Sequence, residues 1–283
     1  KLLSSLIDAP TITGVTCHLD DVFAGFILAQ QSYASGDIIE IITTPSFRRR
    51  GIASGLLDAV TSLLQNNQIP ELFLEVSADN FAESIKFASN VVAADGGANT
   101  CLKYGVKPKA VIGDMDSIDE NSKTQIGQDS IHFVSSQNDT DFEKSLNRIN
   151  APLILGLGFL GDRLDHQMAV QTALVKHYDK KVLLIGSHDL VFLTPPKFSI
   201  NLKNECRVSI YPMGECSVGS KGLRWKTDDI VFSPISTIGT SNCTTGDKIE
   251  LYPSKPLVLT IIPRDFFIPT CLALLASKPW RAN

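Results

Sequence analysis

The sequence lacks several features that would place it in familiar classes. No apolar run approaches the ~20 residues needed to cross a bilayer. The beginning of the sequence shows no basic segment followed by an apolar core and a cleavage site. The six cysteines are scattered and form no Cys-x-x-Cys pair, which favours reduced, partly buried thiols. These absences predict a soluble, cytoplasmic protein without membrane association.

The sequence also lacks an excess of positive charge. The formal net charge is −4, and residues 48–50 (Arg-Arg-Arg) form the only basic run. Because nucleic-acid-binding proteins carry a broad basic surface, nucleic acid is not expected as a partner. The sequence has no Gly-x-x-x-x-Gly-Lys-Ser/Thr phosphate loop, no internal repeat and no low-complexity segment. What remains is ordinary globular composition, with 43% hydrophobic and 20% charged residues.

With 283 residues the chain is long enough for two or three domains. The first predicted domain, residues 1–80, is an α/β unit. Apolar residues at 25–31, 38–44 and 71–77 predict strands, and a helical repeat of apolar residues after Gly51 predicts a helix.

The second predicted domain, residues 81–195, alternates strands and helices. Such alternation is typical of a mainly parallel sheet that is buried on both faces. The predicted strands are 91–94, 110–112, 131–134, 152–157 and 181–185. The predicted helices are 83–90, 98–104, 142–149 and 164–178.

The third predicted domain, residues 196–283, consists of short β-like segments interrupted by Gly, Asn, Asp and Pro, with a helical pattern at 270–277. This pattern predicts a small antiparallel β domain. Its predicted strands are 198–202, 206–211, 230–232, 248–252 and 257–262. The expected fold class is therefore α/β, with a parallel-sheet nucleotide-binding domain followed by a C-terminal antiparallel β domain.

Three short acidic clusters carry the strongest functional signal, at 113–117 (Gly-Asp-Met-Asp-Ser), 139–142 (Asp-Thr-Asp-Phe) and 161–166 (Gly-Asp-Arg-Leu-Asp-His). Each follows a predicted strand or lies close to one. Carboxylates at the ends of parallel strands, such as Asp114 and Asp116, can hold a hard cation against a polyphosphate. A solvated acidic turn would explain any one cluster alone. Together they favour phosphoryl or pyrophosphoryl transfer.

The second cluster also contains a helix-capping signal. Thr140 and Glu143 have the spacing of a capping box for the helix that follows, which accounts for both without any ligand. The cap does not account for Asp139 and Asp141, which add like charges beside it. A bound cation or a sugar hydroxyl would offset this repulsion.

Two glycine-containing turns follow predicted strands. Residues 95–98 (Asp-Gly-Gly-Ala) leave room for backbone N–H groups to reach a phosphate or a base, although an ordinary tight turn has the same composition. Residues 156–161 match the Gly-x-Gly-x-x-Gly dinucleotide fingerprint. Asp162 and Asp165 would then lie near a dinucleotide pyrophosphate with only Arg163 to compensate, which disfavours a nicotinamide or flavin site.

Taken in order, these motifs resemble the thiamine pyrophosphokinase family over about residues 83–262. The matching segments are 94–99, 111–117, 137–144, 158–166, 222–225 and 240–242. The resemblance implies Mg²⁺-dependent transfer of pyrophosphate from ATP to the hydroxyethyl oxygen of thiamine, giving thiamine diphosphate and AMP. It also implies a homodimer, because the family completes its thiamine pocket with a second subunit.

The resemblance further assigns roles to individual residues by motif position. The implied Mg²⁺ ligands are Asp114, Asp116 and Asp141. Asp165 would lie beside the reacting phosphates and complete the catalytic set, and Ser241 and Asn242 would face thiamine. The implied ATP-binding residues are Asp95, Gly96, Gly97, Gln137, Asp139, Thr140, Arg163 and His166.

Two parts of the sequence depart from this family. The family opens with an apolar strand and a Gly-rich turn ahead of the helix that precedes Val91, but no strand fits between Asn80 and Glu83. Either residues are missing there or the first unit lends its strand. The tail from 263 to 283 has no counterpart in the family.

Residues 1–80 resemble a second family, the GNAT N-acetyltransferases, in the segments 48–53 (Arg-Arg-Arg-Gly-Ile-Ala) and 72–80. This resemblance implies an acetyl-CoA site, with Glu75 as general base. Its implied ligands are Arg48, Arg50, Gly51 and Ala53. The family's next helix, which carries the Tyr that acts as general acid, is absent, and this favours a truncated, structural or CoA-binding unit. A solvated basic turn also explains 48–50. An acetyl-CoA-dependent N-acetyltransferase and a non-catalytic nucleotide-binding module therefore remain the alternatives to a pyrophosphokinase.

Overall fold

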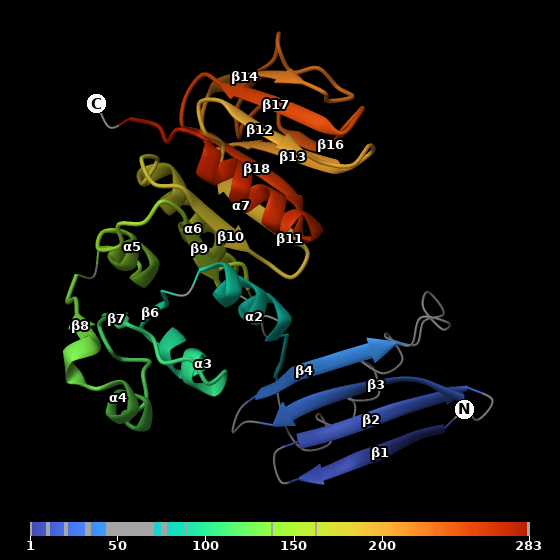
Figure 1. The fold of residues 1–283 in the computed structure, drawn as a ribbon, viewed down its shortest axis with the longest axis vertical. Helices are drawn as coiled ribbons and strands as arrows, with labels where there is room; N and C mark the ends of the chain where they lie inside the picture. Colours follow the sequence, from blue (N-terminus) through green and yellow to red (C-terminus); the bar gives the residue numbers. More distant parts are fainter. Residues whose placement is uncertain are drawn as a thin grey trace. The chain divides into compact units, whose positions relative to one another are not determined.

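The fold is known from a computed structural model, in which the chain divides into two compact units, residues 1–77 and 78–283 (Figure 1). The structure describes residues 2–9, 12–19, 22–31, 35–43, 71–74, 78–88, 90–136, 138–161 and 163–281. Several predictions lie outside these residues: the helix after Gly51, the acetyl-CoA ligands Arg48, Arg50, Gly51 and Ala53, and the roles of Glu75, Gln137 and Asp162. Among the described residues, no helix combines the length and apolar character needed to cross a bilayer.

The first unit contains a five-stranded sheet in the order β1-β2-β3-β4-β5. Its strands are β1 (Leu2–Ala9), β2 (Ile12–Leu19), β3 (Val22–Gln31), β4 (Ser35–Thr43) and β5 (Glu71–Leu74). The first four are antiparallel and β5 runs parallel to β4. The three predicted strands of this unit are confirmed. Sequence analysis missed β1 and β2, and the register of their pairing shifts between Ser5 and Asp8, so β1 has no simple two-residue alternation.

The second unit begins with α2 (Ala78–Phe87) and a sheet of three parallel strands in the order β6-β7-β8. These strands are β6 (Val92–Ala94), β7 (Ala110–Gly113) and β8 (Ile131–Phe133). Two short helices, α3 (Gly97–Lys103) and α4 (Glu120–Ile126), connect them. Ala93 and Val111 pack against Ile126 in a small core, which fixes the sheet beneath the loops that follow each strand.

The next two predicted strands, β9 (Ile154–Leu157) and β10 (Val182–Ile185), pair in parallel with each other, with α6 (Leu164–Lys176) between them. They belong to a different sheet from β6–β8, so the prediction of one mainly parallel sheet over 81–195 is wrong. A hairpin from β10 to β11 (Asp189–Leu193) continues the six-stranded sheet β16-β13-β18-β11-β10-β9 with antiparallel pairing. This sheet runs across residue 195, where sequence analysis places a domain boundary.

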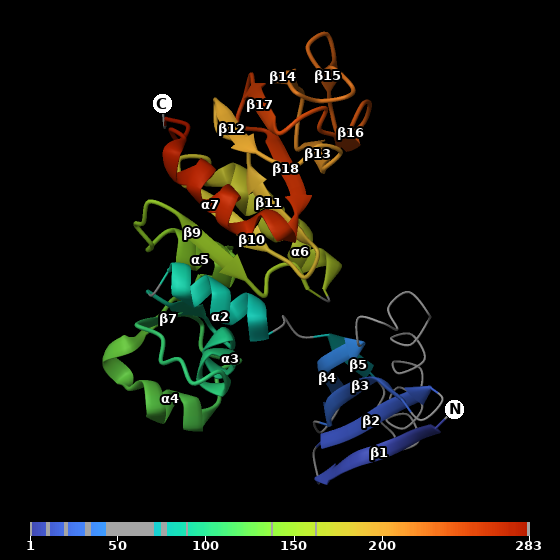
Figure 2. The same ribbon diagram turned by 45° about the vertical axis from the view of Figure 1, so that its right-hand side comes forward.

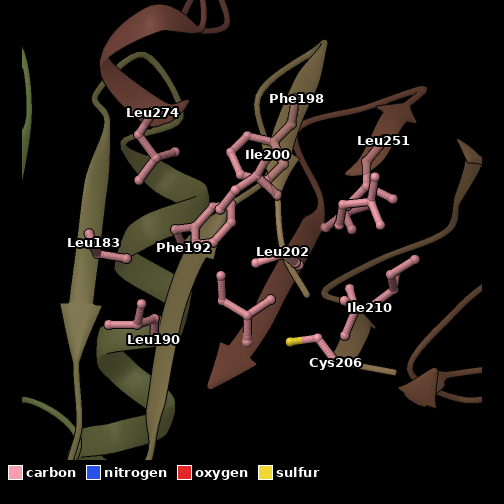
Figure 3. Close-up of a cluster of buried hydrophobic side chains, with 14 of the residues drawn as sticks. Leu183, Leu190, Phe192, Phe198, Ile200, Leu202, Cys206, Ile210, Leu251 and Leu274 are labelled. Carbon is pink, nitrogen blue, oxygen red and sulfur yellow. The ribbon is translucent and has the colours of Figure 1, made fainter. Parts of the chain in front are cut away.

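The C-terminal strands are antiparallel, as predicted, and form two layers. β13 (Arg207–Pro212), β16 (Gly239–Cys243) and β18 (Val258–Pro263) complete the six-stranded sheet. The second layer is β12-β17-β14-β15, formed by β12 (Phe198–Asn201), β17 (Lys248–Pro253), β14 (Cys216–Lys221) and β15 (Val231–Phe232). Buried side chains such as Phe192, Phe198 and Leu251 meet in the core, and Leu274 of α7 (Phe267–Ala276) joins them (Figure 3). All five cysteines of this unit are free thiols, as predicted.

Helix α2 packs within the second unit (Figure 2). The Asn80 Nδ2 donates to the carbonyl of Gly186 at 3.3 Å, and Glu83 forms a 2.6 Å ion pair with Arg264. The helix predicted at 83–90 is therefore present, beginning earlier in the sequence and anchored to the six-stranded sheet and to the segment that precedes α7.

Candidate active site

Three aspartates meet where the parallel strands β6 and β7 end. Asp95 follows β6 directly, and Asp114 and Asp116 follow β7. One carboxylate oxygen from each lies within 4.8 Å of those of the other two, a spacing that permits a shared metal ion. Because the carboxyl ends of parallel strands lie at one edge of a sheet, adjacent strands bring together residues that are distant in sequence.

The backbone is strained at this edge. Among the described residues, four non-glycine residues have a positive φ: Asp95 (40°), Met115 (62°), Glu205 (58°) and Ser241 (61°). Two of these four, Asp95 and Met115, lie in the loops that carry Asp95, Asp114 and Asp116, which we call the acidic edge. Left-handed backbone is unfavourable for side chains with a Cβ and is concentrated at functional sites. A hydrogen bond from the Ser117 amide to Asp95 Oδ2, at 3.1 Å, helps to hold the turn.

Gly113 permits the close approach of the carboxylates. A Cβ at this position would lie 2.8 Å from the Cβ of Asp95 and 3.4 Å from Oδ1 of Asp141. Any side chain here would therefore displace Asp95. Gly96 is similarly tight, with a Cβ there 3.1 Å from that of Ser117, whereas Gly97 has open space around it.

The carboxylate of Asp95 is buried but incompletely satisfied. Only 4% of the residue is exposed, and Oδ1 has no hydrogen-bond partner among the described residues. Burial, together with hydrogen bonding to Asp116, raises the pKa of Asp95. Hydrogen bonds from Ser117 and Asp95 lower the pKa of Asp116. An unpaired buried oxygen among like charges fits a hard divalent cation such as Mg²⁺, which prefers oxygen ligands.

Asp141 is the first residue of α5 (Asp141–Leu146). It is linked to Asp114 by Lys144, which contacts both carboxylates. The Nζ of Lys144 lies 2.8 Å from Asp141 Oδ1 and 3.6 Å from Asp114 Oδ2. Burial lowers the pKa of Lys144, but the contacts with Asp141 and Asp114 outweigh it, so the net pKa is raised. The structure thus brings Asp114, Asp116 and Asp141 to one place, with Asp95 closest to the first two.

Sequence analysis assigned no role to Lys144 and placed Asp95 among the ATP-binding residues rather than the metal ligands. For both residues, the sequence contains an indication of the position that the structure shows. Asp95 follows its strand as Asp114 follows the neighbouring one, and parallel strands end at the same edge. Lys144 stands three residues after Asp141 on a helix, within reach of its carboxylate.

The capping box predicted at Thr140 and Glu143 is confirmed. The Glu143 amide donates to Thr140 Oγ1 at 3.3 Å, and Thr140 N donates to Glu143 Oε2 at 3.3 Å. Lys176 of α6 adds a 2.7 Å ion pair to Glu143. Burial raises the pKa of Glu143, but the bonds from Lys176 and Thr140 lower it by a larger amount. The net pKa is therefore below its ordinary value. These contacts hold α5, and hence Asp141, at the edge, and Asp139 accepts a bond from Ser136.

The third acidic cluster lies at the start of α6. Arg163 and Asp165 form a 2.7 Å ion pair with both side chains largely exposed, and the His166 amide donates to Asp165. Hydrogen bonding to Arg163 lowers the pKa of Asp165. The pair makes local contacts and presents one carboxylate and one guanidinium to solvent.

The two residues predicted to face thiamine differ in exposure. Ser241 is exposed on a strained backbone, at the irregular part of the β13–β16 pairing. Asn242 is buried, and its amide bonds both the N–H and the C=O of Trp225. Asn242 therefore holds the 222–225 segment, while the indole of Trp225 is exposed beside it.

Family models match both resemblances. Residues 81–185 match the thiamin pyrophosphokinase catalytic domain, and residues 4–89 match the acetyltransferase (GNAT) family. Both matches include most of α2, because they overlap over residues 81–89.

Named relatives extend the first match. Thiamine pyrophosphokinase 1 of Oryza sativa subsp. japonica is 28% identical over 62% of this chain and 79% of its own. Thiamin pyrophosphokinase 1 of Caenorhabditis elegans is 27% identical over 65% of this chain and 82% of its own. The solved thiamin pyrophosphokinase from Candida albicans aligns with a TM-score of 0.54 at 20% identity, covering 63% of this chain and 83% of that one, which shows a common fold. The resemblance to thiamine pyrophosphokinases is confirmed.

Proposed function

We propose that this chain is a thiamine pyrophosphokinase, which transfers pyrophosphate from ATP to thiamine and releases AMP. The observation that carries this proposal is the convergence of Asp95, Asp114 and Asp116, joined by Asp141, at the carboxyl ends of β6 and β7. The family match and the named relatives support the same reaction. A homodimer and a cytoplasmic location remain part of the proposal.

The acidic edge is suited to hold Mg²⁺ against a triphosphate. Asp95, Asp114 and Asp116 would hold the ion, which would neutralise charge on the phosphates and on the AMP leaving group. Gly113 keeps the space between the carboxylates open. The α5 cap fixes the position of Asp141.

Other residues would orient the two substrates. The exposed guanidinium of Arg163 at the start of α6 would bond phosphate oxygens, with Asp165, its ion-pair partner, controlling its orientation. The Asp139, Thr140, His166 and Gly96–Gly97 assignments stay predictions for ATP. On the thiamine side, Ser241 would contact the substrate, whereas Asn242 would act through its grip on Trp225.

The test is a product assay on the purified full chain with MgATP and thiamine. We expect thiamine diphosphate and AMP, separated by chromatography. Asp114→Ala and Asp141→Ala should abolish both products while the circular dichroism spectrum and thermal midpoint show a folded protein. Glu120→Ala, an exposed acidic residue paired with Lys123 on α4, is the matched control and should keep activity. Formation of ADP instead of AMP would refute the reaction, and ATP binding without AMP release would indicate a non-catalytic nucleotide module.

The match of residues 4–89 to the GNAT family supports a second candidate activity, acetyl-CoA binding by the first unit. Calorimetric titration of the full chain with acetyl-CoA tests it. Absence of binding heat at high acetyl-CoA concentration would rule it out, and heat that disappears in Arg48→Ala with Arg50→Ala would support it.

A further inference from the structure

Lys144 is a buried cation placed among the carboxylates of the acidic edge. Its side chain is 4% exposed, and its ammonium contacts Asp141 at 2.8 Å and Asp114 at 3.6 Å. Lysine is almost never buried to this extent without a partner. Of these two carboxylates, Asp114 belongs to the candidate metal centre and Asp141 lies beside it.

The position of Lys144 is set by the helix that carries it. Its amide donates to the carbonyl of Thr140 at 2.8 Å, within the capped first turn of α5. Phe142 and Leu146, on the same short helix, are buried in the core with Val170 of α6. The ammonium therefore cannot leave the edge without a change in side-chain conformation, which leaves it close to Asp114 and Asp141.

This placement makes Lys144 a competitor of any divalent cation. The ammonium offers three donors to oxygens that a metal would otherwise coordinate, and its positive charge opposes a second cation nearby. A polyphosphate changes the balance, because its oxygens supply new acceptors for the ammonium and new negative charge for the metal. The same lysine thus opposes a bare ion and favours an ion that arrives with a polyphosphate.

We propose that Lys144 is a built-in counter-cation that makes metal binding at the acidic edge depend on the bound polyphosphate. The proposal rests on the proposed function, because it takes Asp95, Asp114 and Asp116 as the metal ligands of that reaction. Lys144 acts through Asp114 and Asp141, as a positioning residue.

The experiment is a titration of the full chain with Mn²⁺ alone, followed by the electron paramagnetic resonance signal of the free ion. Lys144→Met removes the charge, and Lys144→Gln removes it while keeping a donor for Asp141. Since a unit charge near the site is lost, both variants should bind Mn²⁺ at least about tenfold more tightly than wild type. Addition of a non-hydrolysable ATP analogue should tighten Mn²⁺ binding strongly in wild type and much less in the variants.

Lys248→Met is the matched control. Lys248 is 57% exposed and pairs with Glu250 on β17, so its loss removes a surface positive charge from a strand that carries none of the aspartates. Its Mn²⁺ affinity should stay within about twofold of wild type, because exposed charges are screened by solvent. Circular dichroism and thermal midpoints establish that each variant is folded.

A role in structure alone predicts the opposite result, since like-charged carboxylates would move apart and bind metal less well. Unchanged or weaker Mn²⁺ binding in a folded Lys144→Gln protein would overturn the proposal, as would failure of both variants to fold or the absence of Mn²⁺ binding in all proteins. The proposed function is judged separately. AMP formation by wild type with unchanged Mn²⁺ affinity in the variants would refute the role of Lys144 alone. Tighter Mn²⁺ binding in the variants without AMP formation by wild type would refute the proposed reaction alone.

Discussion

Two carboxylates in the second unit are almost equally buried but differ in their hydrogen-bond and ion-pair partners. Glu143, at 6% exposure, accepts hydrogen bonds from Thr140 and an ion pair from Lys176. Asp95, at 4% exposure, leaves one oxygen without a partner among the described residues and lies beside other aspartates. The pKa of Glu143 is consequently lowered and that of Asp95 raised. Burial alone therefore does not set the direction of a carboxylate's pKa shift, but the supply of partners does.

The two shifts have opposite consequences for stability. A carboxylate with a lowered folded pKa contributes stability above its unfolded pKa and loses this contribution as the pH falls through its folded pKa. A carboxylate with a raised folded pKa reduces stability as the pH rises from its unfolded pKa through its folded pKa. At neutral pH, Glu143 therefore stabilises the fold and Asp95 opposes it. A residue that opposes folding is a functional candidate.

The largest expected effect is at Asp95. Asp95→Asn keeps the shape of the side chain and removes its charge, so turnover to AMP should fall at least about 100-fold if the carboxylate holds the metal. The same change relieves repulsion at the edge, so the thermal midpoint should stay equal or rise. Product chromatography and differential scanning calorimetry provide the two measurements. Retained turnover, or a clearly lowered midpoint, would place Asp95 in the same class as Glu143.

The next effect is at Glu143. Glu143→Gln weakens the cap and removes a partly buried ion pair, so the free energy of unfolding at neutral pH should fall by about 2 kcal/mol. Urea denaturation followed by circular dichroism measures this change. Glu120→Gln is the control, since its exposed pair with Lys123 should contribute less than about 0.5 kcal/mol. Equal effects of the two substitutions would contradict the structural role of Glu143.

A pH series sharpens the comparison with a smaller effect. The stability difference between wild type and Glu143→Gln should be complete above the ordinary glutamate pKa of 4.5 and disappear as the pH falls below it, because the wild-type carboxylate becomes protonated. The difference between wild type and Asp95→Asn should run the other way, growing as the pH rises above the ordinary aspartate pKa of 3.8. Thermal midpoints measured in buffers on both sides of these values test both signs. Parallel pH curves for the two pairs would remove the distinction.

The smallest effect on stability is expected at Asp165. Its ion pair with Arg163 is exposed and screened by solvent, so Asp165→Asn should leave the free energy of unfolding unchanged within the error of the measurement. Turnover should nevertheless fall by about tenfold or more if Asp165 orients groups beside the phosphates. Steady-state kinetics and urea denaturation on one protein preparation give both values. Unchanged kinetics would leave Asp165 as a solvated pair only.

Local patterns predicted most elements of the second unit within a few residues, because helix and strand periodicity is written into short segments. Sheet membership was not predictable in this way. β9 and β10 look like further members of a parallel sheet, but the antiparallel hairpin to β11 and the pairing of β11 with β18 place them elsewhere. These contacts join residues far apart in sequence. Sequence analysis missed the strands β11, β14 and β16 and the helix α4. β16 (Gly-Thr-Ser-Asn-Cys) is almost free of large apolar residues, so only its pairing with β13 identifies it.

The site shows the same division. The capping box was predicted because its spacing is local, and the structure confirms it. The grouping of Asp95 with Asp114 depends on which strands are neighbours, and the burial of Lys144 depends on how α5 packs. A lysine in a short helix normally faces solvent. Its position between two aspartates is therefore a property of the fold, and the catalytic roles remain predictions for the assays above.

Helix α2 also sets a limit on how the chain can be divided. Sequence similarity assigns its residues to both families, but Asn80 and Glu83 are bonded to Gly186 and Arg264 of the second unit. Division of the chain after residue 89, at the end of the acetyltransferase match, would separate Asn80 and Glu83 from their partners Gly186 and Arg264. Division before Ala78 would keep Asn80 and Glu83 with the residues that they contact. Sequence similarity places α2 in both families, whereas its contacts place it in the second unit.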